Sequence, residues 1–466
     1  MIDNQLFNHF KTFVFEIYPL LEISIEKKFF KPQYDKYPKL EFKNNGLPSI
    51  TNYKFSSPYK ISDLFRSWSG KADIELKEFE SYTTLANYLQ NNEKYKECIL
   101  PENIDLDKEE SKFAFMLTMV IEEILERYYL LNKNKSEDEN LLKEIYLQVE
   151  KYIYSDDLYF DISIPILFIK FEVDEYVINE NILIRRITDD YHKARFNIRS
   201  YSPPISDSII SSSTHELVFK NYYIKKGKKY FDNGLSNESA YPIQKFELFF
   251  NAIKIISNIN SGFSQILIYP NGWVDFFHMD LLPLKGISLR KYPNYFDEFY
   301  WNNETLPNLN SEQIKRIGIV YSKLLINENN KIQIANKRLR YSYLRDNEED
   351  SILDIIIALE TLLSDNEKGE LTHKLALRIS ILISTYNHAY NAIEVFELVK
   401  KIYDYRSAVV HGSSKVDSKR EIKINKEALS IKTISVANDY LREIIGILIE
   451  NPEYLNPKEI DKLLLK

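Results

Sequence analysis

Two residues in the last quarter of the chain have side chains suited to catalysis. Arg406 and His411 lie in the stretch DYRSAVVHGSSK, separated by four small or apolar residues, and Gly412 follows the histidine directly. A guanidinium carries a permanent positive charge, and an imidazole has an ordinary pKa near neutrality. This pair therefore supplies a cation and an acid-base group, and it is the candidate catalytic site.

A helix that begins near Ala392 is predicted to carry Arg406. At 100° per residue, its apolar stripe consists of Val395, Val399, Ile402, Arg406 and Val409. Arg406 lies only about 20° from the centre of this stripe. A buried guanidinium without partners is very costly. Arg406 must therefore be paired, hydrogen-bonded, or turned to a cleft that a ligand or a second chain completes.

The end of this helix decides where His411 lies. On a continuous helix, His411 would lie about 140° around the axis from Arg406. Gly412 suits the left-handed residue that ends many helices, and the following SSKVDSKR has the composition of a polar loop. We therefore expect His411 in the last helical position. There the helix dipole favours the protonated imidazole by a few tenths to about 2 kcal/mol, so the histidine can act as a general acid.

Two preceding helices are predicted to pack beside this one. Ser351 is expected to cap the first, with Asp354 as the return partner of a capping box. Its apolar stripe is Ile352, Ile355, Ile356, Leu359 and Leu363, and Glu360 borders this stripe. The second helix, from about Leu371 to Ser384, places Arg378 on a core-facing register with Leu375 and Leu382.

These helices contain two inward-facing arginines and few carboxylates. We expect Glu360 to neutralise Arg378, which leaves Arg406 available for another partner. The alternative is that Arg406 forms an ordinary core ion pair with Asp404 or Glu360. If Glu360 is instead exposed, Arg378 becomes a rival catalytic candidate.

The pattern of apolar and β-branched residues along the chain predicts an α+β protein in three blocks. Residues 1–155 form a mixed, largely helical region, with clear helices in SKFAFMLTMVIEEILERYYLL and ENLLKEIYLQVEKYIY. Residues 156–305 form a small β-rich domain with one helix in ESAYPIQKFELFFNAIKIIS, and we expect a sensing or regulatory role for it. Residues 306–466 form a C-terminal helical bundle.

A hairpin with a basic tip is predicted in YYIKKGKKYF, residues 222–231. Its four lysines are Lys225, Lys226, Lys228 and Lys229. A solvated turn is the simpler interpretation. The functional interpretation is a contact with RNA phosphate.

The composition of the chain argues against several classes of protein. A net charge of −7 argues against a surface that is entirely a nucleic-acid platform. One cysteine, Cys98, excludes intrachain disulfides, and the N-terminal stretch lacks the features of a signal peptide. No apolar stretch reaches the roughly 18 residues of a membrane helix. We therefore expect a cytoplasmic protein.

The remaining histidines predict no metal site. They are His9, His192, His215, His278, His373 and His388, and none shows the paired spacing of metal ligands. The sequence also lacks the phosphate-binding, hydrolase and dinucleotide motifs GxxxxGK[ST], GxSxG and GxGxxG. We expect no metal and no cofactor.

The segment YRSAVVHG, preceded by SILDIIIALETLLSDNEKGELTHKLALRISILI, resembles the HEPN ribonucleases. It is most similar to the Apea-like HEPN proteins of bacterial anti-phage defence. The resemblance covers roughly residues 310–450, and more loosely the stretch from ENILIRRIT to GFSQILIYP. It implies a HEPN-like bundle that cleaves RNA without a metal at a site shared by two copies. The catalytic arginine and histidine of the family correspond to Arg406 and His411.

Two features depart from the family pattern. Ser407 stands where the family often has Asn, Asp or His after the arginine. No tyrosine follows the histidine closely, so control by nucleotidyl transfer is not expected.

The residue types agree with RNA cleavage on chemical grounds. RNA supplies its own nucleophile, the 2′-hydroxyl, so the enzyme needs an acid-base group and a cation for the charge that develops on phosphorus. We expect an endoribonuclease toxin of antiviral defence, acting by abortive infection, whose partners are RNA, a second copy and a phage-derived trigger or regulatory protein. One alternative is a non-catalytic HEPN module that binds RNA or protein as a dimerisation scaffold. Another is a toxin held by a separate antitoxin.

Overall fold

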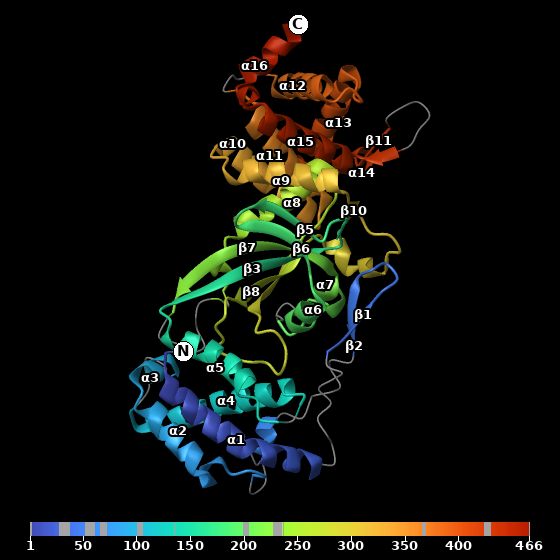
Figure 1. Cartoon of the computed structure of the whole chain (residues 1–466). Coiled ribbons are helices and arrows are strands. Elements are labelled where there is room, and N and C mark those ends of the chain that lie inside the picture. Colours follow the sequence, from blue (N-terminus) through green and yellow to red (C-terminus); the bar gives the residue numbers. More distant parts are fainter. Residues whose placement is uncertain are drawn as a thin grey trace. The chain divides into compact units, whose positions relative to one another are not determined.

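The computed structural model, drawn in Figure 1, describes most of the chain. The described residues are 2–27, 38–51, 61–65, 72–99, 106–134, 136–198, 205–226, 235, 237–365, 370–423 and 430–465. They form two compact units, each assembled from segments that are not consecutive in the sequence. The first unit consists of Met1–Pro165, Asn181–Tyr241 and Gln265–Leu289, and the second of Ile166–Glu180, Pro242–Ser264 and Arg290–Lys466. The block boundaries expected near residues 155 and 305 stay predictions.

The α+β class is confirmed. The N-terminal part of the chain begins with the helices α1 (Asn4–Lys27), α2 (Glu80–Gln90), α3 (Glu93–Ile99), α4 (Leu106–Leu131) and α5 (Glu139–Tyr154). The hairpin β1 (Lys39–Phe42) and β2 (Pro48–Thr51) and the 3-10 turns η2 (Ile61–Leu64) and η3 (Leu76–Glu78) lie between α1 and α2. Helices α4 and α5 are the two predicted from the apolar spacing. Helix α5 begins where the side chain of Asp138 accepts a hydrogen bond of 3.0 Å from the backbone N–H of Leu141.

An antiparallel six-stranded sheet follows these helices. In spatial order its strands are β5 (Glu175–Asn179), β6 (Ile182–Arg186), β7 (Ser213–Lys225), β3 (Asp157–Leu167), β8 (Phe263–Pro270) and β9 (Lys285–Lys291). The register aligns Ile182 with Phe219, and Phe160 with Pro270. Strands β3, β6, β7 and β8 lie within residues 156–305, the block predicted to be β-rich. The short helices α6 (Asp189–Arg195) and α7 (Asp207–Ser211) lie between β6 and β7 in the chain.

A buried arginine holds these two short helices together. Arg195 is fully buried, and its Nη2 donates to the carbonyl oxygen of Ser211 at 3.0 Å. Its Nη1 donates to Gln265 Oε1 at 3.0 Å. Its Nε donates to Nδ1 of His192 at 3.2 Å. Burial, and then the neighbouring Arg195 charge, lower the pKa of His192 to about 2, so this histidine stays neutral as a hydrogen-bond acceptor.

The C-terminal helices pack together around one central helix. They are α8 (Ile243–Ser257), α9 (Ser311–Leu325), α10 (Asn330–Leu344), α11 (Glu348–Leu363), α12 (Leu371–Tyr386), α13 (Ala392–Val410), α14 (Val416–Lys419), α15 (Thr433–Glu450) and α16 (Pro457–Asp461). Helix α15 packs against each of α8 to α13, and Figure 1 shows it among them. Its buried residues include Val436, Tyr440, Ile444 and Leu448, one per turn. Among the described residues, no helix is both long enough and apolar enough to cross a membrane.

Four short strands and several 3-10 turns complete the description. Strands β4 (Lys170–Phe171) and β10 (Asn308–Leu309) pair in parallel, and β11 (Glu421–Lys423) and β12 (Ser430–Lys432) pair antiparallel. The turns are η4 (Glu238–Ala240), η5 (Asn294–Asp297), η6 (Tyr300–Asn302), η7 (Pro452–Leu455) and η8 (Lys462–Leu465).

The predicted start of α11 is wrong. Asn347, not Ser351, caps the helix, because its side chain accepts from the backbone N–H of Glu349 at 2.8 Å. Ser351 is buried inside the first turns and donates to the carbonyl oxygen of Ser342 at 2.8 Å. Asp354 is not a capping residue either. It is 2% exposed and accepts from Arg338 at 2.5 Å and from Arg345 Nε at 3.0 Å.

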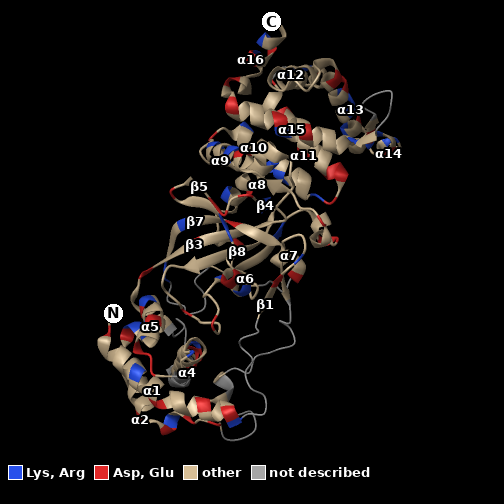
Figure 2. Ribbon diagram, turned by 45° about the vertical axis from the view of Figure 1, so that its right-hand side comes forward, with Lys and Arg blue, Asp and Glu red and all other residues tan. Residues whose placement is uncertain are grey.

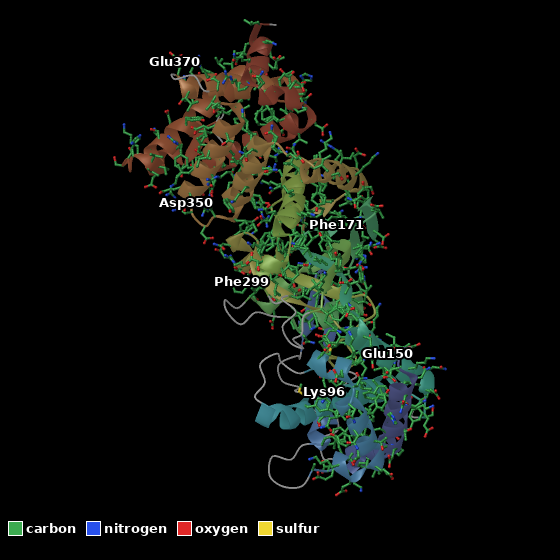
Figure 3. The ribbon with its side chains drawn as sticks, turned by 90° about the vertical axis from the view of Figure 1, so that its left-hand side faces the viewer. Lys96, Glu150, Phe171, Phe299, Asp350 and Glu370 are labelled. Carbon is green, nitrogen blue, oxygen red and sulfur yellow. The ribbon has the colours of Figure 1, made fainter. Side chains whose placement is uncertain are left out.

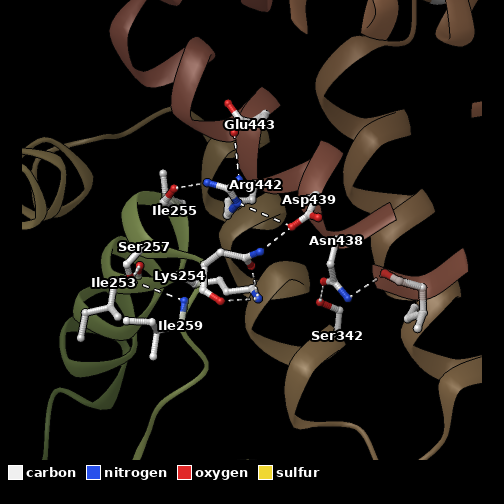
Figure 4. Close-up of polar contacts among 12 residues, drawn as sticks. Ile253, Lys254, Ile255, Ser257, Ile259, Ser342, Asn438, Asp439, Arg442 and Glu443 are labelled. Carbon is white, nitrogen blue, oxygen red and sulfur yellow. Dashed lines mark hydrogen bonds and ion pairs between the residues drawn. The ribbon is translucent and has the colours of Figure 1, made fainter. Parts of the chain in front are cut away.

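A polar network joins the end of α8 to α15, as Figure 4 shows. Lys254 Nζ donates to Asn258 Oδ1 at 2.6 Å, and Asn258 Nδ2 donates to Asp439 Oδ1 at 2.7 Å. Asn258 ends α8 in the left-handed conformation, with φ of 56°. Arg442 donates to the carbonyl oxygen of Ile255 at 2.8 Å. The network therefore satisfies the last turn of α8 from α15.

Lys254 makes stability depend on pH. Burial first lowers its pKa to about 8, while Asp439 raises it and Arg442 lowers it further. An unfolded lysine keeps its proton to about pH 10.4, so the unfolded chain binds more protons between about pH 8 and 10. Burial of the charged Lys254 ammonium therefore lowers the free energy of unfolding by about 3 kcal/mol below pH 8. This destabilisation is lost as the pH rises from about 8 to 10. Relative to Lys254→Met, the wild type should gain about 1 kcal/mol of unfolding free energy from pH 7 to pH 9.

Urea titrations at both pH values measure this difference. Lys245→Met is the matched control, because Lys245 lies exposed on the same helix. It should leave the pH dependence of the wild type unchanged. Parallel pH profiles for wild type and Lys254→Met would contradict the assignment.

Candidate functional site

The end of α13 positions the candidate site. Asn391 caps the start of the helix by accepting from the backbone N–H groups of Ile393 and Glu394 at 2.9 and 3.2 Å. His411 is the C-terminal cap, and Gly412 takes the left-handed conformation with φ of 59°. A Cβ at Gly412 would meet no atom within 4 Å, so the backbone angle rather than space requires glycine. The predicted helix end is therefore confirmed.

Arg406 lies where the buried face of α13 opens. Val395, Val399 and Ile402 are each 1% exposed, but Arg406 and Val409 are half-buried. The Nε atom of Arg406 is buried without a hydrogen-bond partner. Within the described part of the chain, no hydrogen bond or ion pair reaches its other guanidinium nitrogens either. The guanidinium is thus held beside the core with its hydrogen-bonding capacity unused.

Other buried arginines differ in this respect. Arg340 and Arg442 also have a buried Nε without a hydrogen bond. However, the Nη groups of Arg340 donate to Ser261 and Lys291 carbonyl oxygens at 3.1 and 2.6 Å. Unused capacity at all guanidinium nitrogens is therefore what distinguishes Arg406 from these two residues.

Tyr403 is a neighbour of Arg406 that the sequence analysis missed. Its side chain is buried, and its hydroxyl donates to Glu360 Oε1 at 3.5 Å. Burial, and then Glu360, raise the pKa of Tyr403, whereas the positive charge of Arg406 lowers it. Tyr403 is therefore hydrogen-bonded to the carboxylate and close enough to the guanidinium to feel its charge. The signal was its position three residues before Arg406, which places both side chains on one helix face.

The predicted pair of Glu360 with Arg378 is wrong. Arg378 is 3% exposed, and its Nε and Nη2 each donate to Asp461, at 2.8 and 2.7 Å. Its Nη2 also donates to Asp365 at 2.7 Å, and its Nη1 to the carbonyl oxygen of Leu363 at 2.9 Å. Arg378 thus reaches beyond the end of α11, whereas Glu360 lies a turn earlier.

Arg378 is not a rival catalytic candidate. It lines a cavity of about 220 Å³ together with Lys374, Lys458 and the two aspartates. Because two carboxylates and a carbonyl oxygen occupy its guanidinium, it has little capacity left for a ligand. Its role is to bind α16 to α12.

The remaining candidates at α13 are accessible. Asp404, Ser407 and His411 are all exposed. Asp404 accepts from Lys419 Nζ through its backbone oxygen at 3.1 Å. An ion pair of Arg406 with Asp404 or Glu360 is not found among the described residues. The alternative of an ordinary core ion pair therefore does not hold there.

The basic hairpin is only partly described. Lys228 and Lys229 lie outside the described residues, and Lys225 is exposed at the end of β7. Lys226 donates to the carbonyl oxygens of Tyr152 and Ile153 at 2.8 and 2.5 Å. It thus caps the C-terminal end of α5, where the helix dipole favours a cation. Two acceptors thus already hold its ammonium, and the RNA contact of Lys226 stays a prediction.

The remaining histidines differ in burial. His192 and His215 are buried at 2% and 1% exposure, and His373 and His388 are exposed. In the described ranges, no group of three or more His, Cys, Asp or Glu side chains is arranged to hold a metal ion.

Comparisons with models of protein families, with curated proteins and with solved structures found no match. The resemblance to HEPN ribonucleases therefore stays a prediction that rests on the residues of the chain.

Removal of Asp461 should destabilise the protein more than removal of Glu360. Asp461→Ala leaves a buried guanidinium short of one carboxylate, so we expect a loss of about 3 kcal/mol of unfolding free energy. Glu360→Ala removes one long hydrogen bond and should cost about 1 kcal/mol. Urea unfolding followed by circular dichroism measures both. A larger loss for Glu360→Ala would show that the assigned partners of Arg378 are wrong.

Proposed function

We propose that the C-terminal helices form a metal-independent endoribonuclease of the HEPN type. The observation that carries the proposal is the guanidinium of Arg406, which has no hydrogen-bond partner among the described residues and lies at the end of the helix that His411 caps. A stable fold gains nothing from a half-buried cation without a counter-charge. A phosphate group would supply both the negative charge and the acceptors that Arg406 lacks.

The two side chains meet the needs of RNA cleavage. The 2′-oxygen attacks the adjacent phosphorus, the bond from phosphorus to the 5′-oxygen breaks, and a 2′,3′-cyclic phosphate forms. The proton of the 2′-hydroxyl passes to a water molecule, and the departing 5′-oxygen receives a proton from the His411 imidazolium. His411 is exposed and suited to deliver this second proton. Arg406 would stabilise the negative charge on the phosphoryl oxygens in the transition state.

Cations after His411 favour a polyanionic substrate. Lys415, Lys419 and Arg420 follow within ten residues, and Figure 2 shows basic residues at α14. Arg420 is partly neutralised by Glu349 at 3.2 Å and by Asp417 at 3.3 Å. Lys415 is exposed, with no ion pair to any described residue. These side chains would contact phosphates that flank the cleaved bond.

A second copy would complete the site. Val410, directly before His411, is 48% exposed. In the shared site that the family resemblance implies, a second copy would cover this side chain and bring its own Arg406 and His411. We therefore propose a homodimer through α13. Following the family resemblance, the enzyme would act in the cytoplasm as a toxin of anti-phage defence, controlled by a phage-derived trigger or regulatory protein.

Cleavage of a labelled RNA in the presence of EDTA tests the proposed activity. His411→Ala should lower the rate by about 10²- to 10⁴-fold, because it removes the acid-base group. Arg406→Lys should also be strongly impaired, because lysine lacks the planar fork that matches a phosphate. The matching 2′-deoxy strand should survive, because the attacking hydroxyl is absent.

Two surface variants serve as matched controls. His388→Ala, in the turn between α12 and α13, and Arg316→Lys, on α9, alter exposed residues of the second unit and should keep full activity. Thermal melts of all variants should agree with the wild type. Loss of activity with EDTA, equal cleavage of the deoxy strand, or full activity of His411→Ala would each contradict the mechanism. If the wild type binds RNA but never cuts it, a non-catalytic binding module becomes the better assignment.

Mixing two inactive variants tests the shared site. If Arg406 and His411 act together across two copies, Arg406→Ala mixed with His411→Ala should recover part of the lost activity through mixed dimers. Sedimentation velocity should detect the dimer at the concentrations used. A strictly monomeric protein that remains fully active would contradict the shared site without affecting the proposed chemistry.

A further inference from the structure

The segment between β9 and β10 holds an exposed aromatic residue in a strained conformation. Phe299 has φ of 59° and ψ of 21°, in the left-handed region that bulky side chains avoid. Its ring is 70% exposed, and in Figure 3 it lies at the margin of the ribbon. Exposure of a large ring and backbone strain are both unfavourable. Their coincidence at one residue needs a reason.

A second phenylalanine of the same unit provides a comparison. Phe168 also has φ of 59°, but it is 1% exposed. Its ring packs edge-on against Phe296 and Tyr300, with centroids 4.7 and 5.0 Å away. Burial and ring contacts thus offset the strain at Phe168. They do not do so at Phe299.

The neighbouring turns hold Phe299 in place. Phe296 in η5 is fully buried and stacks on Tyr300 in η6, with a centroid distance of 4.7 Å. The carbonyl oxygen of Phe299 accepts from the backbone N–H of Asn302 at 2.9 Å. The ring of Phe299 lies 5.4 Å from that of Trp301, which is half-buried. The result is a fixed pair of rings, Phe299 and Trp301, of which Phe299 projects outward.

The residues next to this ring pair in the chain include acidic side chains. Glu298 and Glu304 are exposed and form no ion pair with any described residue. Asp297 is also exposed, but it pairs with Arg290 at 2.8 Å. Two carboxylates without an ion pair to a described residue therefore flank the rings along the chain, within three residues of Phe299 or Trp301.

We propose that the Phe299–Trp301 ring pair is a docking site for a segment of a partner protein that combines apolar side chains with Lys or Arg. Rigid aromatic rings are typical anchors of protein interfaces. The carboxylates would pair with the cations of that segment and would repel a nucleic-acid backbone. Burial in the partner would offset the exposure that the free protein retains. This docking site is independent of the proposed nuclease activity.

The first measurement concerns the strain. Glycine adopts the left-handed conformation without cost, so Phe299→Gly should fold and should raise the melting temperature by roughly 2 °C or more. Phe42→Ala is the control, because Phe42 is 57% exposed on β1 and has no positive φ. It should cause no such rise. A lower melting temperature for Phe299→Gly would overturn the assignment of strain.

The second measurement concerns the partner. A ribosome-displayed library of random dodecapeptides is selected on the immobilised wild type, with counter-selection on Phe299→Gly. Enriched peptides should combine apolar residues with Lys or Arg. A synthetic peptide from the selection should bind Phe299→Gly at least tenfold more weakly than wild type, and Phe42→Ala equally well. Glu298→Gln should weaken it less, and more so at low salt.

Four results would overturn the proposal. They are the absence of enrichment against Phe299→Gly, enrichment without basic residues, a single-stranded RNA whose binding depends on Phe299, and a homodimer that Phe299→Gly dissociates. The last two would assign the rings to RNA or to a second copy instead.

Discussion

A buried guanidinium without hydrogen-bond partners is very unfavourable, and this constraint explains several contacts between helices and loops of the second unit. Arg378 meets this constraint with Asp365, Asp461 and a carbonyl oxygen. Arg340 meets it without a carboxylate, by donating to carbonyl oxygens and to Tyr343 Oη, and by lying 5.2 Å from the ring centroid of Phe250. Each arginine joins segments that are distant in sequence. Because both are used in this way, they fix the helices rather than a ligand.

Arg406 departs from this pattern in a structure that otherwise follows it. Its helix is regular, its stripe is buried for three turns, and its end is set by the left-handed Gly412. The same glycine that stops the helix also leaves His411 at the surface. The end of the helix at Gly412 thus accounts for the exposure of the imidazole. This is why a short stretch of sequence was informative about this helix end.

Local sequence patterns could predict many helices and strands, but not which side chains pair between them. The periodicity of α5, α8, α12 and α13 and the β-branched runs of β3, β6 and β7 were visible, because buried faces impose them. Strands β5 and β9 were missed, since they lie at the edges of the sheet and are only partly buried. Asp461, which pairs with Arg378 across 83 residues, was also missed. The spacing of residues along one helix does not show which side chains of another helix will contact it.

The sequence offers two possible N-terminal capping residues for α11, and the wrong one was predicted. Asn347 and Ser351 are both good capping residues, and only one can begin the helix. The choice of Asn347 places Asp354 inside the helix, where it is buried with Arg338 and Arg345. The capping box was a plausible local solution, but the helix is capped at Asn347 and Asp354 is used in buried ion pairs instead.

Two sites in the second unit hold groups that are unfavourable in the described fold, and the two sites differ in the sign of their charge. Arg406 is a cation without acceptors, whereas Phe299 is an exposed ring flanked along the chain by carboxylates without an ion pair to a described residue. A polyanion would satisfy the first and be repelled by the second. A basic protein surface would do the reverse. The chemistry therefore separates the two sites by ligand class, so that a partner bound at Phe299 would not compete electrostatically with RNA at Arg406. Such a separation is compatible with the two proposals, a nuclease site at Arg406 and a protein-docking site at Phe299.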